Sequence, residues 1–284
     1  MATTAFMTQF RNEFIAGFEQ NQSIVRESTT FEATISGNQA VFLVADSGNA
    51  SAVTRGVNGL IPKRTDNLTQ NTATLQEWHD IPTRTRFNIF ASQGDQRRIM
   101  YKTAQAVINR KVDEDIITEL NTATNDTGAA TTASLNLAIR AKTILGNNKV
   151  PHDGNICALV TPAFIGYLMQ VKEFANAEYV SPRPVQDGSP FWSDRPGYHV
   201  WLGIKWMEHP ELPGAGTAAE KCFMYHKSAI GHAADTSGMQ MVPGYDDEQD
   251  YSFCRASVFM GSKLLQNSGV VVINHDGSAI SAVF

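Results

Sequence analysis

The feature that most constrains this fold is a row of apolar residues at every fourth position of one long helical pattern. The row consists of Met100, Ala104, Ile108, Val112, Ile116 and Leu120. An α-helix turns once in about 3.6 residues, so this row winds by about 40° per step and about 200° over its length. A helix that packs on one core keeps one stripe. We therefore predict that the two ends of the helix are packed on opposite sides.

The helix is predicted to begin near Ser92 and to end at about Leu120. Ser92 is an N-cap candidate, and Asp95 lies three residues on, as in a capping box. A helix of about 29 residues is about 43 Å long. That length is more than a compact domain of this size usually needs.

The charges on this helix are reversed relative to its dipole. Arg97, Arg98 and Lys102 lie near its start, and the acidic residues near its end are Asp113, Glu114, Asp115 and Glu119. One interpretation is a solvated face, with Lys111 paired to Glu114 and Asp115. The other is an ion-pair register between neighbouring copies. In that case, reversing Asp113 and Glu114 to lysine disrupts assembly without unfolding the subunit.

A long polar connection precedes this helix. An amphipathic helix carrying Phe6, Phe10, Phe14 and Phe18 and a strand pair around residues 36–38 come first. From about Asp46 to Asn88 the chain then has little to bury, which is uncommon for a connection inside a compact domain. Alternation in "TATLQEWHDI" indicates strand. A two-stranded ribbon is marginally stable by itself, so this arm needs a surface that a neighbouring subunit could supply.

The rest of the chain alternates elements and then becomes rich in strands. A helix is predicted from Thr132 to Leu145, and Thr161 with Pro162 starts another through Phe174. Residues 181–197, rich in Pro and Gly, are predicted to form a surface loop. Strands are predicted at 155–160, 198–209, 220–226, 250–261 and 269–276, the last two around a turn near 267–269.

Composition excludes several classes of protein. The 284 residues, 42% of them hydrophobic, can form one or two domains. With 23 basic and 28 acidic residues the net charge is −5, which gives no electrostatic footprint for tight nucleic-acid binding. No apolar stretch is long enough for a membrane span, and no secretory signal is visible. The three cysteines, Cys157, Cys222 and Cys254, are expected to be buried free thiols.

No motif supports a catalytic, cofactor or metal site. The turn-like segment 213–221 lacks the pattern of a phosphate loop, and a plain turn is the better interpretation. Cys222, His226 and His232 lack a fourth ligand at matching spacing, which favours structural roles. The cluster "EWHD", residues 77–80, favours solvated or interface contacts over acid–base catalysis. We predict a protein that is not an enzyme, with no cofactor and no metal.

The order of these elements resembles a known family. The segments that carry the resemblance are "QRRIMYKTAQAVINRKVDEDIITELNTA", "FMYHKSAIGHA" and "DYSFCRASVFMGSKLLQNSGVVVIN". The first is similar to the spine helix of major capsid proteins of tailed bacteriophages, which have the Hong Kong ninety-seven fold. The other two are similar to that family's capsomer-centre strand and helix and its returning strands.

This resemblance implies an α+β phage major capsid fold with five parts. The implied parts are an N-terminal arm with an amphipathic helix (1–30), a strand pair with an extended β-hairpin loop (31–90), a peripheral domain with the spine helix (91–155), an axial α/β domain (156–240) and returning peripheral strands (241–284).

The resemblance also implies a function and partners. Copies of the chain would form pentamers and hexamers of an icosahedral shell around double-stranded DNA, assembled in the host cytoplasm into a virion. The implied partners are a portal protein, a separate scaffolding protein and decoration or cement proteins, with no membrane. Lys63 lies in the extended loop, but the asparagine and glutamate that some relatives use for covalent linking have no match here.

Eight residues are candidates for contacts between subunits, because their side chains are long, charged or have a large apolar area. They are Arg55, Lys63, Arg64, Trp78, Arg97, Arg98, Asp113 and Glu114. Two alternative functions remain open. An encapsulin-type compartment has a similar fold but carries cargo enzymes, and a soluble enzyme has no need of the long arm.

Overall fold

A computed structural model describes residues 23–31, 34–47, 50–91, 96–175, 198–234 and 239–281. The chain forms two compact units, which are described separately below. The first unit comprises residues 1–23, 77–112 and 234–259, and the second comprises residues 24–76, 113–233 and 260–284. The predicted N-terminal helix and the predicted loop 181–197 lie outside the described residues.

The first unit contains residues 251–259 of a long strand, β12 (Tyr251–Leu264). Strand β11 (Gln240–Asp246) runs antiparallel to it, with Gln240 opposite Ser257 and Asp246 opposite Tyr251. Strand β5 (Thr83–Thr85) and strand β4 (Gln76–Asp80) also pair with β12. The short helix α1 (Arg86–Ala91), which was not predicted, follows β5.

The second unit contains a five-stranded sheet in the order β13-β9-β6-β8-β7. Its parallel pair is β6 with β8, and the other neighbours are antiparallel. All five residues of β6 are buried, as expected for a central strand. The strands are β6 (Ile156–Val160), β7 (Tyr198–Trp201), β8 (Ile204–Glu208), β9 (Glu220–His226) and β13 (Val270–His275).

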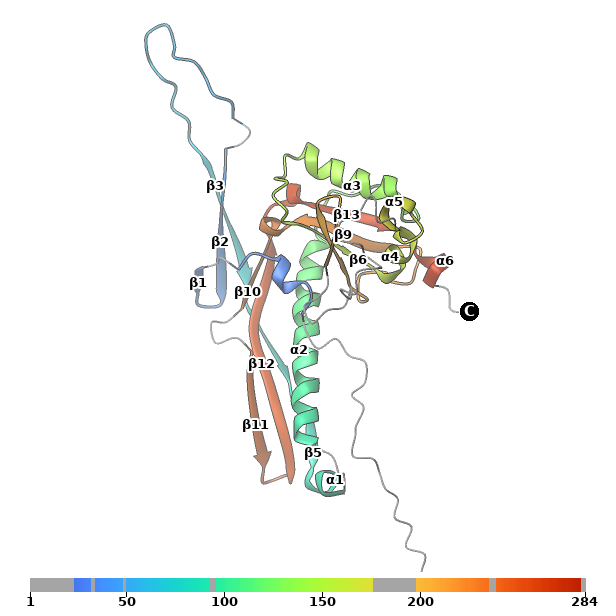
Figure 1. Ribbon diagram of the computed structural model, residues 1–284. Coiled ribbons are helices and arrows are strands. Elements are labelled where there is room, and N and C mark those ends of the chain that lie inside the picture. The colour runs from blue at the N-terminus through green and yellow to red at the C-terminus, as the bar shows by residue number, and fades with distance from the viewer. Residues whose placement is uncertain are drawn as a thin grey trace, which may run out of the picture. The chain divides into compact units, whose positions relative to one another are not determined.

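Short helices surround this sheet. Helix α3 (Leu135–Asn147) packs on β13 and β9 (Figure 1), and Ser134 caps its start by accepting a hydrogen bond from the Leu137 N–H. The others are α4 (Pro162–Leu168), α5 (Lys172–Ala175) and α6 (Ser278–Ser281), with short 3-10 turns η1 (Arg26–Ser28), η2 (Lys227–Ala229) and η3 (Asn267–Gly269). Strand β10 (Ile230–Ala234) follows η2 and is a neighbour of β12.

A long hairpin also belongs to the second unit. Strand β1 (Thr34–Ser36) turns at Gly37, whose φ of 62° suits glycine, into β2 (Gln39–Asp46). Strand β3 (Asn67–Thr74) then pairs antiparallel with β2 along its whole length. The chain between them forms a long loop beyond the strand ends (Figure 1), and within 47–66 the described residues contain no helix or strand.

The long helix α2 (Gln96–Leu120) confirms the winding row. All six members of the row are buried, from Met100 to Leu120. The helix contributes Gln96–Val112 to the first unit and Asp113–Leu120 to the second. Its predicted start at Ser92 lies outside the described residues. The burial of the row means that both segments of this continuous helix supply core residues.

The prediction for the helix that starts at Pro162 is partly wrong. Thr161 caps it and accepts a hydrogen bond from the Phe164 N–H, as expected. However, it ends at Leu168 rather than continuing to Phe174. The Gln170 N–H bonds to the Tyr167 carbonyl and the Val171 N–H to the Leu168 carbonyl, so the chain tightens into turns before α5 begins.

No helix among the described residues has the length and apolar content needed to span a bilayer.

The packing of Phe42 on Gly231 gives a test of the hairpin base. A Cβ on Gly231 would lie 2.6 Å from Cε1 of Phe42, whose side chain is buried with Ala40, Ala73 and Ala233. We expect Gly231→Ala to lower the free energy of unfolding by about 1–3 kcal/mol. Gly56→Ala is the control, since its Cβ would meet only the Leu60 carbonyl oxygen at 3.7 Å. Chemical denaturation of the unassembled subunit measures both, and equal stability of the two variants would contradict this packing.

Candidate assembly interface

The hairpin β2–β3 has one buried and one exposed face. Ala40, Phe42 and Ala73 are buried at its base. Leu43 lies opposite Gln70, and Ala45 lies opposite Leu68, which places Leu43 and Leu68 on the same face. These two leucines are 80% and 77% exposed, so the hairpin presents apolar area that its own chain does not cover.

The loop beyond the hairpin strands continues this apolar character. Gly56 and Gly59 form a turn, in which the Gly56 N–H bonds to the Leu60 carbonyl and the Gly59 N–H to the Gly56 carbonyl. The loop also carries three candidate contact residues, Arg55, Lys63 and Arg64, all of them exposed, and Arg64 pairs with Asp66. Its exposed large apolar side chains are Val53, Val57, Leu60 and Ile61.

Trp78 is held by its own chain. It lies on β4, is half-buried, and the Lys111 Nζ lies 4.2 Å from the centre of its ring. Its neighbours Glu77 and His79 pair at 2.7 Å. Burial raises the pKa of Asp80, against the opposing effect of Arg110. The cluster 77–80 therefore makes structural contacts within the first unit, and the role of Trp78 between subunits stays a prediction.

The prediction that Asp113 contacts a neighbouring subunit is wrong. Its side chain is 1% exposed, and the backbone N–H groups of Ile24 and Val25 donate to its Oδ2 and Oδ1 at 3.0 and 3.3 Å. Oδ2 also lies 3.4 Å from the His209 Nε2. An ion-pair register between copies cannot use a buried carboxylate, and lysine at this position would place an ammonium group among donors.

Two further acidic residues at the end of α2 also have partners in the second unit. Ser262 Oγ donates to the Asp115 Oδ2, and the Leu264 N–H donates to the Glu119 Oε2. Asp115 and Glu119 are therefore not simply solvated, whereas Glu114 is exposed and the predicted pairing of Lys111 with Glu114 and Asp115 stays a prediction. The remaining candidates on α2 are the exposed Arg98 and Glu114, and Arg97, whose side chain lies outside the described residues. Their role between subunits stays a prediction.

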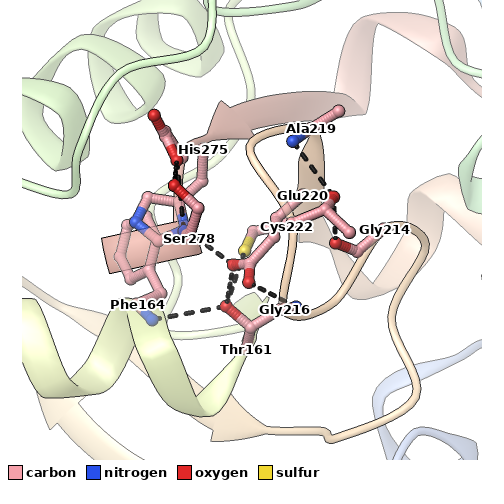
Figure 2. Close-up of polar contacts among 11 residues, drawn as sticks. Thr161, Phe164, Gly214, Gly216, Ala219, Glu220, Cys222, His275 and Ser278 are labelled. Carbon is pink, nitrogen blue, oxygen red and sulfur yellow. Dashed lines mark hydrogen bonds and ion pairs between the residues drawn. The ribbon is translucent and has the colours of Figure 1, made fainter. Parts of the chain in front are cut away.

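A second buried carboxylate, Glu220, organises one edge of the five-stranded sheet (Figure 2). Glu220 is 1% exposed and lies at the start of β9. Its Oε2 accepts from the Thr161 Oγ1 at 2.6 Å and lies 2.7 Å from the His275 Nδ1, while its Oε1 accepts from the Gly216 N–H at 2.7 Å. One carboxylate thus joins the N-cap of α4, the end of β13 and the loop before β9.

Segment 213–221 contributes to this cluster through the Gly216 N–H group. Gly214 and Gly216 have positive φ values of 74° and 82°, as in a tight turn. The Gly216 N–H, which a phosphate loop would offer to an anion, already donates to Glu220. The structure therefore confirms a plain turn.

His275 packs among aromatic rings. Phe164 and Tyr167 meet its ring edge to face at 5.0 and 5.6 Å. Its Nδ1 is the nitrogen near Glu220, and its Nε2 is buried without a hydrogen bond to any described residue. Sequence reasoning did not single out either Glu220 or His275, because no spacing links residues 55 positions apart.

His232 has a distinct buried environment in the second unit. Its Nδ1 lies 3.0 Å from Ser262 Oγ, which itself donates to Asp115, so the Nδ1 carries the proton. Its Nε2 makes no hydrogen bond within the described part of the chain. Burial, together with the nearby charge of Arg26, lowers the pKa of His232 to about 4, against the opposing effect of Asp113.

The cysteines are buried free thiols, and no metal site is found among the described residues. Cys157, Cys222 and Cys254 are free and buried, as predicted. Burial raises the pKa of the Cys157 thiol to about 11 and that of Cys222 to about 12. Among the residues that the structure describes, no group of three or more His, Cys, Asp or Glu side chains is arranged to hold a metal ion.

Several solved structures that are similar to this chain come from tailed phages and from a GTA particle. A chain from Mycobacterium phage Che8 matches with a TM-score of 0.73 at 15% identity, covering 96% of this chain and 98% of that chain. The capsid of Ralstonia phage GP4 matches with a TM-score of 0.66 at 11% identity, covering 97% and 98%. The capsid of a native GTA particle matches with a TM-score of 0.66 at 13% identity, covering 93% of both chains. The fold is therefore the Hong Kong ninety-seven type of phage capsids.

The family follows from the sequence. The model of the phage capsid protein family matches residues 2–277, so the chain belongs to this family. A search of curated proteins finds no match. The chain is a structural capsid protein that self-assembles into the shell of a virion, and it is not an enzyme. This confirms the resemblance and excludes the soluble-enzyme alternative.

The lowered pKa of His232 predicts a pH dependence of stability. Below its ordinary pKa of 6.5 the unfolded chain gains a proton, whereas the folded chain gains it only near pH 4. The free energy of unfolding should therefore fall as the pH drops from about 6.5 to about 4, by roughly 3 kcal/mol at most from this group. His232→Asn, which keeps a donor toward Ser262, should show a shallower dependence. Denaturation of the unassembled subunit across this pH range measures it, and identical slopes would refute the assignment.

Proposed function

We propose that this protein forms the pentamers and hexamers of an icosahedral shell that encloses the double-stranded DNA genome of a tailed phage. The observation that carries this proposal is the hairpin β2–β3, whose exposed face and loop present apolar side chains far from any described core. A solitary domain has little use for such an arm, because exposed apolar area costs free energy until another surface covers it. A neighbouring copy supplies that surface in a closed shell.

Two further observations support this architecture. One structural relative is a chain of the capsid of a native GTA particle. The net charge of −5 also suits a wall that encloses nucleic acid without condensing on it. DNA is then contained by the shell rather than bound by sequence.

The proposed partners follow from the same family. They are a portal protein, a separate scaffolding protein, and decoration or cement proteins, with assembly in the host cytoplasm. We also keep the five-part division as part of the proposal. In it, the hairpin is the extended loop, α2 is the spine of the peripheral domain, and the five-stranded sheet belongs largely to the axial domain.

Negative-stain electron microscopy of the purified protein tests the proposal. Uniform closed shells are expected, and particles the size of small oligomers under all assembly conditions would contradict it. An encapsulin-type compartment would also give closed shells. Nuclease-protected double-stranded DNA in particles from the native source supports the phage shell, whereas packaged cargo enzyme supports the compartment.

The exposed face of the hairpin predicts a specific assembly defect. Leu68→Asp places a charge on apolar area that the proposed neighbour covers, so the variant should form few or no closed shells under conditions where the parent protein assembles. Because Leu68 is 77% exposed in the subunit, its stability should change by no more than about 0.5 kcal/mol. Electron microscopy and denaturation of the subunit measure the two effects.

Gln70→Glu is the matched control. Gln70 lies two residues along β3, so it shares the face of Leu68, and the substitution adds one negative charge without removing apolar area. It should assemble as the parent protein does. Normal assembly of Leu68→Asp would show that this face is not an interface.

A further inference from the structure

The first described residues form a strap across the second unit. Val25, Ser28 and Thr29 are buried, although they lie in a short segment with one 3-10 turn and no long helix or strand of its own. The segment is tied down at its far end by Thr30, whose N–H donates to the Ile230 carbonyl and whose carbonyl accepts from the His232 N–H. We call residues 24–31 the strap.

The middle of the strap is fixed by hydroxyl groups. Ser28 Oγ donates to the Val25 carbonyl, so the Tyr225 hydroxyl donates to Ser28 Oγ in turn. Thr30 Oγ1 donates to the Lys227 carbonyl at 3.0 Å. These contacts hold the strap after Val25, but they do not reach its first two backbone N–H groups.

The start of the strap is held by Asp113. The Ile24 N–H donates to one carboxylate oxygen and the Val25 N–H donates to the other. His209 adds a third group on the same side, with Nε2 3.4 Å from Oδ2. Its Nδ1 accepts from the Glu211 N–H, so the ring proton is on Nε2, which lies near the carboxylate but makes no hydrogen bond to any described residue.

We propose that Asp113 is the positioning residue that fastens the start of the strap to α2. Only a carboxylate fits this task, because each of its two oxygens accepts from a different backbone N–H group. An amide offers one acceptor and turns its own N–H groups toward the second donor. Asp113 thus acts on the placement of residues 24–31 within the subunit.

Hydrogen–deuterium exchange of the unassembled subunit tests this, so the test does not depend on shell formation. In Asp113→Asn the amides of residues 24–31 should exchange about tenfold faster or more than in the parent protein, while those of β6, β9 and β13 keep their rates. Glu114→Gln is the matched control, since Glu114 is the next residue on α2 and is exposed. It should leave the strap unchanged.

Two results would overturn the proposal. Unchanged exchange in the strap would mean that Asp113 does not fasten it, and equal acceleration throughout the second unit would make Asp113 an ordinary core residue. If Asp113→Asn does not fold, Ile24→Pro removes one donor from the strap side and leaves α2 intact. Ile24→Pro should raise the exchange rates of the strap relative to Ile24→Ala, which keeps the N–H group. Equal exchange in these two variants would refute the proposal that Asp113 fastens the strap.

Discussion

One continuous helix, α2, supplies buried side chains to both units of this protein. Because its apolar row has a spacing of four on a helix of about 3.6 residues per turn, the buried face moves around the axis as the chain advances. Met100 is buried at one end of the row and Leu120 at the other. An amphipathic helix with a single apolar stripe cannot bury residues on different faces at its two ends. The winding row is therefore the constraint on which the remaining packing depends.

The winding apolar row brings several charges near the end of the helix into packed surroundings, while Glu114 and Thr118 stay exposed. Asp113, Asp115 and Glu119 fall where the second unit packs, and each accepts hydrogen bonds from that unit. Burying a carboxylate is costly unless donors replace water. Glu220 is also a buried carboxylate with polar partners, and these partners come from three different elements. Acidic residues in this protein therefore determine where non-adjacent segments meet.

This explains which features could be predicted from the sequence. Periodicity, caps and turn residues are local, and they correctly gave the winding helix, the Thr161 cap, the turn at Gly37 and β9. The partners of Asp113 and Glu220 lie 89 and 55 residues away, and nothing local marks them. Asp113 was consequently assigned to the surface because its neighbours in sequence are charged. The end of α4 was missed because the tightened turn after Leu168 carries no glycine or proline.

In the hairpin, the exposed side chains rather than the buried ones bear on the proposed function. At its base Phe42 and Ala73 are buried, so its direction is set by the second unit, whereas Leu43 and Leu68 farther along are exposed. A two-stranded ribbon with uncovered leucines gains stability only when its free face is covered. In a family of shell proteins the surface available at high local concentration is another copy of the same chain. Under the proposed function, the apolar area that is unfavourable in the single subunit would become a driving force for assembly once copies meet.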